Sequence, residues 1–387
     1  MIQRIASKEL ASLAKQFKVV AVTGPRQSGK TTLVRSQFPE KTYLNFENPD
    51  LRFFASQDPR GFLANYPQGA ILDEVQHVPV LFSYLQQVVD ERNVPGQFIL
   101  TGSNNLLLQE SISQSLAGRV AYLFLLPLSL HEIGELLPDD LNQLMHRGFY
   151  PALYDQPEMD TSRWYNNYIR TYLERDIRLL KNISNWLLFE RFVRMLAARV
   201  GQLLNMSSLA NEVGVDVKTI QSWLGVLEVG FVVFRLRPYY RNFNKRLVKT
   251  PKIYFYDTGL AAALLGIDRP AGLQYHYLRG ALFENMIISD FLKQRFNQGK
   301  DNNLYFWRDN TGNEIDLIID SLDHPAIIEI KSGETIAEHY FKGLQLWTKI
   351  SGTGNGMLIY GGGTSYMGGR FRVLSYRDLG KIEGIEI

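Results

Sequence analysis

The sequence predicts an α/β protein whose first part is a P-loop-type parallel sheet flanked by helices. Apolar, strand-like runs alternate with amphipathic stretches through residue 126, which is typical of repeated strand–helix units. A helix–turn–helix pattern follows, and the last third contains an alternating hairpin pattern. At 387 residues the chain is too long for one ordinary core. We expect an ATPase-like core at 1–135, a helical and winged-helix region at 136–270, and an α/β nuclease-like domain at 271–387.

The composition is ordinary for a globular protein and excludes some kinds of site. Hydrophobic residues make up 45% of the chain and charged residues 21%. Cysteine is absent, which excludes disulfides and cysteine-based zinc sites and suits a reducing cytoplasm, where we expect the protein. No apolar stretch approaches a membrane span, so we expect no membrane partner. The formal charge of +3 permits a nucleic-acid partner but does not require one.

Five apolar runs are expected to form the sheet of the first part. They lie at residues 19–23, 42–46, 70–74, 97–101 and 120–124. The stretches between them, such as 79–91, have the apolar spacing of covering helices. In an open parallel sheet, ligands bind beyond the carboxyl ends of the strands. The residues that directly follow these runs are therefore the first candidates for a site.

Residues 24–31 match the full phosphate-binding pattern G-x-x-x-x-G-K-[ST] between a strand and a helix. Its glycines are expected to let the chain wrap closely around a triphosphate. Backbone N–H groups and the helix N-terminus favour phosphate, Lys30 adds a full charge, and Thr31 offers a hydroxyl to Mg²⁺. The predicted nucleotide-binding residues are Gly24, Pro25, Arg26, Gln27, Ser28, Gly29, Lys30, Thr31 and Thr32.

The run at 70–74 ends in two adjacent carboxylates, Asp73 and Glu74. A buried strand that ends in two acids is costly unless both have partners. We expect Asp73 to hold Mg²⁺ through its water shell, and Glu74 to orient and deprotonate the attacking water. With Lys30, Glu74 is the core of the catalytic prediction. The sequence has no recognisable guanine-specificity motif, which favours ATP over GTP.

Polar residues elsewhere are candidates for contact with the γ-phosphate. Asn104, or its neighbour Ser103, follows the run at 97–101 and would hydrogen-bond the γ-phosphate or the attacking water. The alternative for these two is a helix cap. Arg119 is suited to contact the oxygens of the transferred phosphoryl group. Arg175 is the alternative for this role, in which it could act on the site of a neighbouring subunit. The second arrangement would require a homo-oligomer, and the sequence does not separate the two arginines.

These motifs together resemble a known family. The phosphate-binding loop, the segments 71–76, 100–104 and 116–119, and Pro-Leu-Ser-Leu-His-Glu at 127–132 are similar to AAA-type ATPases fused to an uncharacterised C-terminal domain. The resemblance covers the whole chain. It implies an AAA+-like or STAND-like core in which the strand before the loop is central, with ATP and Mg²⁺ as cofactors.

The middle part has the layout of a winged helix. Residues 206–228 predict two helices joined by a glycine turn, with Asp216 capping the second helix. The runs at 231–236 and 252–256 look like the strands of a wing, with basic residues between and beside them, including Lys252. One interpretation is DNA binding, with the second helix in the major groove and the wing on phosphates. The other is an architectural role, since that helix offers no arginine for a guanine.

A hairpin pattern in the last third gathers charged residues. Residues 314–320 alternate in polarity, and 326–331 return as a second strand. On the return strand Glu329 and Lys331 share one face, because side chains alternate with period two. Asp316 on the first strand can point to the same side. The hairpin thus predicts a compact acidic cluster with one lysine.

Glu284, on an expected helix at 277–295, would complete this cluster. The carboxylates would hold one or two metal ions, and Lys331 would assist the water nucleophile, which are the minimal parts for Mg²⁺-dependent phosphodiester cleavage. The set resembles the PD-(D/E)xK nuclease superfamily, with Asp316, Glu329 and Lys331 matching its motif residue by residue. The chain departs from that pattern in having no proline before the aspartate. The alternative is an amphipathic hairpin with paired charges facing water.

Two functions are compatible with these predictions. The first is an enzyme that couples Mg²⁺-dependent ATP hydrolysis to DNA binding or processing, with a metal-dependent nuclease-like C-terminal domain. The second is a nucleotide-gated switch whose C-terminal domain is a non-catalytic protein-interaction module. ATP is a partner in both, whereas DNA is a partner only in the first.

Overall fold

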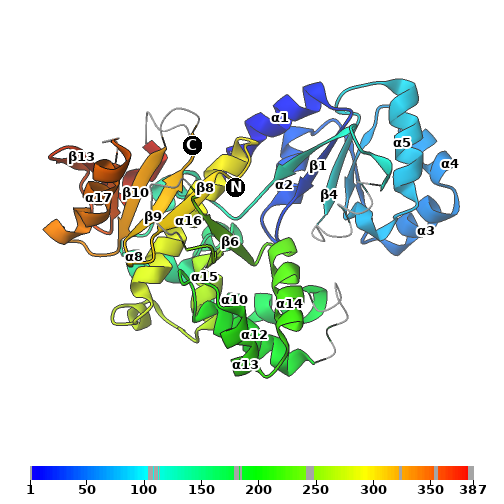
Figure 1. The fold of residues 1–387 in the computed structure, drawn as a ribbon. Coiled ribbons are helices and arrows are strands. Elements are labelled where there is room, and N and C mark those ends of the chain that lie inside the picture. Colours follow the sequence, from blue (N-terminus) through cyan, green and yellow to red (C-terminus); the bar gives the residue numbers. More distant parts are fainter. Residues whose placement is uncertain are drawn as a thin grey trace. The chain divides into compact units, whose positions relative to one another are not determined.

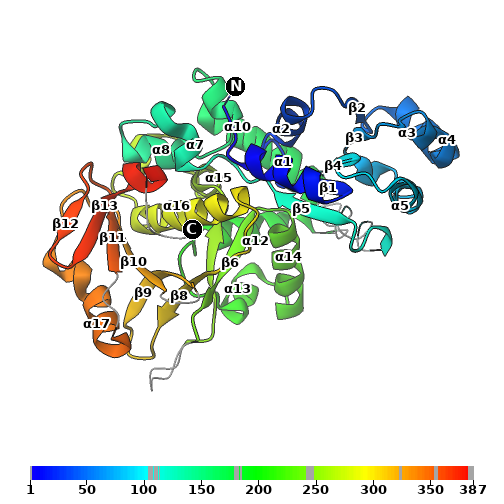
Figure 2. The same ribbon diagram turned by 90° about the horizontal axis from the view of Figure 1, so that it is seen from above.

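In the computed structural model the chain forms two compact units. The structure describes residues 2–102, 108, 112, 114–177, 183, 185–240, 248–321, 325–352 and 356–381. The first unit contains the residues up to 127 together with the short segments 229–231 and 295–301, and the second contains the rest. The regions expected as a second and a third domain thus lie in one compact unit. Figures 1 and 2 show the elements of each unit from two directions.

The first unit is built on a five-stranded parallel sheet, as the sequence predicts. Its strands are β1 (Val19–Thr23), β2 (Thr42–Asn45), β3 (Ala70–Asp73), β4 (Phe98–Gly102) and β5 (Val120–Phe124). Its described helices are α1 (Ala6–Gln16), α2 (Lys30–Gln37), α3 (Pro49–Gln57), α4 (Pro59–Ala64) and α5 (Leu81–Arg92), with a 3-10 turn, η1, at Val75–His77.

The strands are ordered β2-β3-β4-β1-β5. The middle position therefore belongs to β4, and β1, which leads into the phosphate-binding loop, lies between β4 and β5. The expectation of a central β1 is corrected to an interior one. Because all pairs are parallel, the ends of β1, β3 and β4 lie along one edge of the sheet, so Asp73 comes next to the loop.

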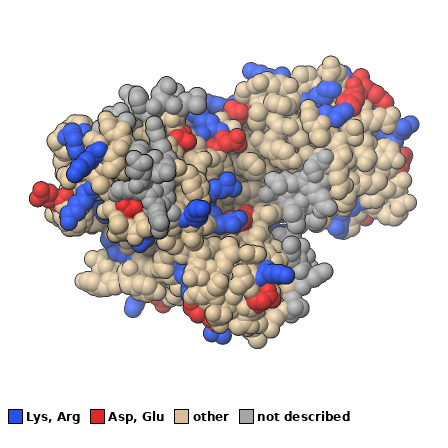
Figure 3. Space-filling view, viewed as in Figure 1, with Lys and Arg blue, Asp and Glu red and all other residues tan. Residues whose placement is uncertain are grey.

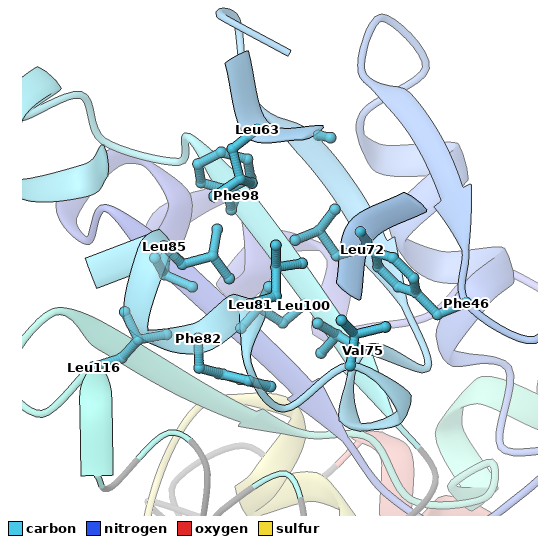
Figure 4. Packing of buried hydrophobic residues seen from close by; sticks show 14 of the residues in the cluster. Phe46, Leu63, Leu72, Val75, Leu81, Phe82, Leu85, Phe98, Leu100 and Leu116 are labelled. Carbon is cyan, nitrogen blue, oxygen red and sulfur yellow. The ribbon is translucent and has the colours of Figure 1, made fainter. Parts of the chain in front are cut away.

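Both faces of this sheet are covered, which explains why its strands are continuous apolar runs. Helices α1 and α2 pack on one face, against strand residues such as Val20 and Ile99. Helices α3, α4 and α5 pack on the other face (Figure 1). Figure 4 shows this second core, where Leu100 of the sheet lies beside Leu81 of α5. The sheet is therefore a rigid base for the loops at its edge.

The second unit is built on a mixed eight-stranded sheet of order β12-β13-β11-β10-β9-β8-β6-β7, which Figure 2 shows from above. Its strands are β6 (Val233–Pro238), β7 (Lys252–Phe255), β8 (Leu304–Arg308), β9 (Glu314–Ile319), β10 (Ala326–Lys331), β11 (Gly356–Tyr360), β12 (Tyr366–Gly368) and β13 (Phe371–Ser375). Helix α17 (Lys342–Ser351) covers part of the sheet through Leu344 and Trp347.

Most of the helices precede the long strands of this sheet. The described ones that begin in the second unit before β8 are α7 (Leu130–Ile133), α8 (Leu141–Arg147), α9 (Ala152–Asp155), α10 (Thr161–Tyr168), the π-helix η3 (Ile169–Ile177), α12 (Trp186–Ala197), α13 (Met206–Val213), α14 (Val217–Val229), α15 (Thr258–Leu264) and α16 (Arg279–Asn297). The 3-10 helices are η2 (Gly134–Leu136), η4 (Pro270–Leu273), η5 (Glu338–Phe341) and η6 (Tyr376–Lys381). Among the described residues, none of the helices is long and apolar enough to cross a membrane.

The predicted pair of helices is present, but the strands that follow it are not a free wing. Helices α13 and α14 are joined at Gly214, and the Asp216 carboxylate accepts the N–H of Thr219 at 2.8 Å. Strand β6 pairs with β7 on one side and with β8 on the other, so the hairpin is the edge of the eight-stranded sheet. Lys252 is only 3% exposed, which overturns its expected contact with DNA phosphates.

The predicted acidic hairpin is present as β9 and β10, which pair antiparallel with Ile328 opposite Leu317. It does not lie on the surface. Both strands are interior to the sheet, since β8 and β11 flank them, and both are largely buried. The alternative of an exposed amphipathic hairpin with charges in water is therefore wrong. Charged groups on these strands need partners inside the protein.

Candidate functional site

The phosphate-binding loop connects β1 to α2. Gly29 has a φ of 89° directly before the first residue of α2, a left-handed conformation that glycine adopts without strain. Gly24 is required by the protein itself, apart from the expected close approach to a triphosphate. A Cβ atom at this position would lie 2.1 Å from the carbonyl oxygen of Leu125, so the neighbouring chain itself requires a glycine.

Lys30 is buried inside this loop. Its Nζ donates hydrogen bonds to the carbonyl oxygens of Gly24 at 3.0 Å and Pro25 at 2.8 Å. Burial lowers the pKa of Lys30 to about 8, although the charges of Glu74 and Asp73 oppose the shift. An ammonium that is buried against neutral carbonyl groups gains strongly from an anion. The geometry of the loop therefore fits a phosphate group at Lys30.

Asp73 lies at the end of β3 and is held by hydroxyl groups. Thr31 Oγ1 donates to Asp73 Oδ2 at 2.9 Å, which joins the loop to the strand. The Tyr43 hydroxyl of β2 donates to the same oxygen at 2.5 Å, and the Thr101 hydroxyl of β4 donates to Oδ1. Neither Tyr43 nor Thr101 was expected from the sequence. Their position could have indicated this contact, because both are polar residues in the two strands that flank β3.

Glu74 follows Asp73 in a strained backbone conformation. Its φ of 54° lies in the left-handed region, which costs a non-glycine residue roughly 1–2 kcal/mol. Such strain often marks a functional residue. Its Oε2 accepts a hydrogen bond at 2.5 Å from Nε2 of Gln76, which is buried in the 3-10 turn η1. Gln76 therefore positions the carboxylate, a role that the sequence did not indicate.

Arg119 does not lie in this site within one chain. It directly precedes β5, and the first residue of β5 pairs with Val19, the first residue of β1. Arg119 is therefore at the amino end of the sheet, whereas the loop follows the carboxyl end. Its Nε and Nη2 atoms each donate to the Asp90 carboxylate at 2.7 Å. The prediction that Arg119 completes the nucleotide site of its own chain is wrong.

The remaining predicted γ-phosphate contacts fall outside the described part of the chain. Asn104 and Ser103 lie there, and so does the side chain of Arg175. Within the loop, Arg26 Nη2 is 3.8 Å from Glu47 Oε1. Thr32 lines an open cavity of about 490 Å³ beside α2, whose other lining residues are Thr31, Arg35, Ser36, Phe38, Pro39, Lys41, Tyr43 and Ile71.

A buried arginine, Arg4, stabilises the phosphate-binding loop through its backbone. The Arg4 guanidinium donates to the carbonyl oxygen of Ser28 at 2.6 Å and to that of Leu126 at 2.8 Å. It thereby ties the middle of the loop to the chain that leaves β5. No sequence motif pointed to Arg4, because it precedes the loop by some twenty residues and acts through backbone atoms.

In the second unit, the predicted hairpin residues come together. Lys331 Nζ donates to Asp316 Oδ2 at 2.8 Å and to Glu329 Oε2 at 2.9 Å. The backbone N–H of Ile330 also donates to Asp316 Oδ2, at 2.8 Å. Glu284 of α16 belongs to the same cluster, since oxygens of Glu284, Glu314 and Asp316 lie within 4.8 Å of one another. The predicted constellation is therefore assembled, and Glu314 is an unexpected member.

Burial and neighbouring charges shift these groups in different directions. Burial raises the pKa of Glu329 well above its usual value, and the charge of Asp316 adds to the effect. Burial also raises the pKa of Glu284. For Asp316, burial acts in the same direction but is outweighed by Lys331 and Lys252, which lower its pKa. Asp316 is therefore the most readily ionised of these three carboxylates.

One oxygen in the cluster has an unmet hydrogen-bonding capacity. Glu329 Oε1 is buried and has no hydrogen-bond partner among the described residues. It lies against the first turn of α17, where a Cβ atom on Gly343 would be 1.9 Å away. A buried carboxylate oxygen without a donor is an available ligand for a cation. The residues present thus fit a divalent metal ion.

Lys252 of β7 enters the same cluster from another part of the chain. Its Nζ donates to Glu284 Oε1 at 2.9 Å and forms an ion pair with Glu314. The Tyr254 hydroxyl donates to the same Glu284 oxygen at 2.5 Å. Burial opposes the charge of Lys252, but the surrounding acids, Glu284 foremost, outweigh it and raise its pKa. The sequence had no local signal for this contact.

Helix α16 is fixed to the sheet edge next to Lys252. The side-chain amide of Asn285 accepts the N–H of Phe255 at 2.6 Å and donates to its carbonyl oxygen at 3.0 Å. This amide continues the hydrogen bonding of the edge strand β7. Glu284, which precedes Asn285 on α16, bonds Lys252 of the same strand.

Three families match successive segments of the chain. Residues 16–134 match an AAA domain, residues 138–271 a domain of unknown function (DUF8612), and residues 279–379 a domain of unknown function (DUF4143). The first match confirms the predicted AAA-type core. The names of the other two assign no activity.

Relatives that match most of the chain are found in mycobacteria. An uncharacterized protein of Mycobacterium tuberculosis, Rv2008c, is 35% identical over 337 residues, which cover 86% of this chain and 74% of the relative. An uncharacterized protein of Mycobacterium bovis matches to the same extent. Among solved structures, a Walker-type ATPase of Pyrococcus abyssi is similar with a TM-score of 0.45 at 14% identity, covering 67% of this chain and 94% of that one. These values are too low for the structural likeness to indicate function.

The lowered pKa of Lys30 predicts that the affinity for ATP falls as the pH rises above about 8. Phosphate stabilises the charged ammonium, so the pKa of Lys30 is higher in the bound state. Below the free-state value both states are protonated, and the affinity does not change. Above it, binding must take up a proton, and the affinity falls by up to about tenfold per pH unit.

Isothermal titration calorimetry in buffers of different ionisation enthalpy measures this proton uptake. At about pH 9 the wild type should take up a proton on binding ATP, whereas Lys30→Arg, which stays charged, should not. An affinity of the wild type that is constant across this range would contradict the assignment.

Substituting Gly343 should destabilise the second unit. An alanine Cβ would overlap Glu329 Oε1, and overpacking of this kind costs typically about 1–3 kcal/mol. Gly225, inside α14, is the matched control because a Cβ there would meet no atom of the described residues within 4 Å. Gly225→Ala should be neutral or stabilising by up to about 1 kcal/mol, since alanine favours a helix. Thermal unfolding of both variants tests this, and equal effects would refute the tight contact at Glu329.

Proposed function

The chain belongs to the same family as the two mycobacterial relatives and contains an AAA domain, and from this premise we propose that it binds ATP and hydrolyses it with Mg²⁺. The observation that carries the proposal is the contact of Thr31 with Asp73 at 2.9 Å. It joins the hydroxyl of the loop to the carboxylate of the neighbouring strand, which is the pair of groups that holds a nucleotide-bound Mg²⁺.

Each residue of the site has a separate task in this proposal. Lys30 and the N–H groups of the loop bind the phosphates, and Thr31 and Asp73 hold Mg²⁺. When bound, Mg²⁺ neutralises charge that develops on the phosphate oxygens. Glu74 orients the attacking water and accepts its proton. Gln76 holds the Glu74 carboxylate in position before the nucleotide arrives.

We expect Glu74→Gln to bind ATP as the wild type does but to hydrolyse it at least about a hundredfold more slowly, because general-base catalysis contributes about 10²–10⁴. Lys30→Met should instead lose binding of ATP. Release of phosphate and equilibrium binding of a fluorescent ATP analogue separate the two effects. Arg119→Met is the control and should keep the wild-type rate in dilute protein, where no neighbour contributes a side chain.

The outcome for Arg119 also tests an oligomeric site. The wild-type rate per chain could rise with protein concentration. If Arg119→Met did not show this rise, the arginine would be assigned to the site of a neighbouring chain. If Glu74→Gln hydrolysed ATP at the wild-type rate, Glu74 would not be the general base.

For the second unit we propose metal-dependent binding and cleavage of DNA, coupled to the ATPase. The meeting of Asp316, Glu329 and Lys331 at 2.8 and 2.9 Å supports this proposal, together with the unpaired Glu329 Oε1. Asp316 and Glu329 would hold a divalent ion, with Glu284 close by. A bound ion activates water and neutralises a phosphate oxygen. Lys331 would stabilise charge on the scissile phosphate.

Contacts with DNA would be local and moderate in number. On the face of the molecule in Figure 3, basic and acidic side chains are interspersed. The net charge of the chain is also only +3. Since phosphate contacts dominate affinity for DNA and are weakened by salt, binding should be detectable mainly at low ionic strength.

Asp316→Asn and Lys331→Met should each abolish cleavage of plasmid DNA in Mg²⁺ or Mn²⁺. The exposed Lys349 on α17 offers a charge-matched control, and Lys349→Met should cleave as the wild type does. Agarose gel electrophoresis of the plasmid, with and without ATP, measures the effect. Absence of both cleavage and low-salt DNA binding in the wild type would favour the nucleotide-gated switch with a non-catalytic C-terminal module.

A further inference from the structure

The acidic site of the second unit contains a lysine that the proposed chemistry does not use. Lys252 is the first residue of β7, and its side chain is 3% exposed. Its Nζ lies 2.9 Å from Glu284 Oε1 and is also ion-paired with Glu314. Glu284, Glu314 and Asp316 are the carboxylates whose oxygens lie close enough together to share a metal ion. The ammonium thus stands where a cation would bind.

The position of Lys252 is fixed from its backbone outward. The residue pairs with Leu236 of β6 and forms a further bridge to Leu203. Its ammonium also lies 5.5 Å from the centre of the Phe306 ring, an attractive cation–π distance. A lysine fixed in this way differs from a flexible surface lysine that forms an ion pair only transiently. Its charge is a permanent part of the site.

The charges of the site leave little room for two metal ions. Its four carboxylates belong to Glu284, Glu314, Asp316 and Glu329, and three basic side chains of the described residues contact them, namely Lys252, Lys331 and Arg308. With all of these groups ionised the site carries one net negative charge, which one divalent ion at the unpaired Glu329 oxygen would already more than balance. A second ion would need the oxygens that Lys252 occupies, and both cations cannot share them.

We propose that Lys252 is a built-in cation that takes the place of a second metal ion between Glu284 and Glu314. The site then binds one divalent ion, at Asp316 and Glu329. This extends the proposed metal site of the second unit and can be tested separately from it. Lys252 lies in the segment 138–271, whereas the carboxylates lie in 279–379, so the site takes groups from both matched segments.

The number of bound ions is the direct test. Calorimetric titration with Mn²⁺ alone, on the full chain carrying Asp73→Asn to remove the metal ligand of the ATPase site, gives this number. We expect one ion for this background, two after the additional change Lys252→Met, and one again after Lys252→Met with Glu314→Gln. An unchanged number in Lys252→Met would overturn the proposal.

Because the loss of Lys252 leaves buried acids without a counter-charge, Lys252→Gln provides a second variant whose amide still donates to one carboxylate. In the absence of metal both variants should melt at a lower temperature than the background. Mn²⁺ should raise their Tm by several degrees more than it raises that of the background, by about 2–4 °C per kcal/mol of added binding. A merely structural lysine would give the lower Tm without this additional rise, which would also overturn the proposal.

The same titration keeps the two proposals apart. If the Asp73→Asn background binds no ion, the metal site proposed for Asp316 and Glu329 fails. A gain of one ion in Lys252→Met or Lys252→Gln would still support the role of Lys252. If the background binds one ion and neither variant gains another, the metal site stands and the inference about Lys252 fails.

Discussion

A buried carboxylate is stable in a covered sheet only when other groups in the protein donate hydrogen bonds to it or form ion pairs with it. Both candidate sites depend on this constraint. In the first unit, Asp73 is met by neutral donors, the hydroxyls of Thr31, Tyr43 and Thr101. Its charge is therefore solvated but not cancelled. In the second unit, Asp316 and its neighbours are met by ammonium groups, which cancel much of their charge. Among the described residues, Asp73 is thus hydrogen-bonded to hydroxyls, whereas Asp316 and Glu329 of the second site are bonded directly to the Lys331 ammonium.

The same constraint explains why the middle and last parts of the chain form one compact unit. Glu284 of α16 and Glu314 of β9 form ion pairs with Lys252, which comes from β7. Strand β7 in turn reaches the main sheet through β6, and Asn285 of α16 binds its free edge. The strands that look like an independent wing are therefore the edge of the sheet that carries the acidic site. A separate wing would remove the Lys252 ammonium from Glu284 and Glu314.

Much of the first unit follows from the sequence, because all five strands are apolar runs covered on both faces. The placement of Arg119 could also have been read from the sequence. In a parallel sheet, a residue that precedes a strand lies at the edge opposite to a loop that follows one, so Arg119 before β5 and Lys30 after β1 are at opposite edges. Lys252 could not be placed in this way, because its contacts depend on the pairing of β6 with β8, some seventy residues apart.

The two functions that the sequence left open differ in what they require of the buried charges. Hydrolysis of a phosphodiester requires a metal ion with open positions for water and phosphate. A module that only binds a partner needs no such ion, because Lys252 and Lys331 already stabilise its buried acids. The lysines alone therefore account for the folding of this cluster. They do not account for Glu329 Oε1, which is buried without a donor among the described residues. In a metal site that oxygen would bind the ion, whereas in a purely structural cluster its burial without a donor only destabilises the fold. This difference favours the enzyme.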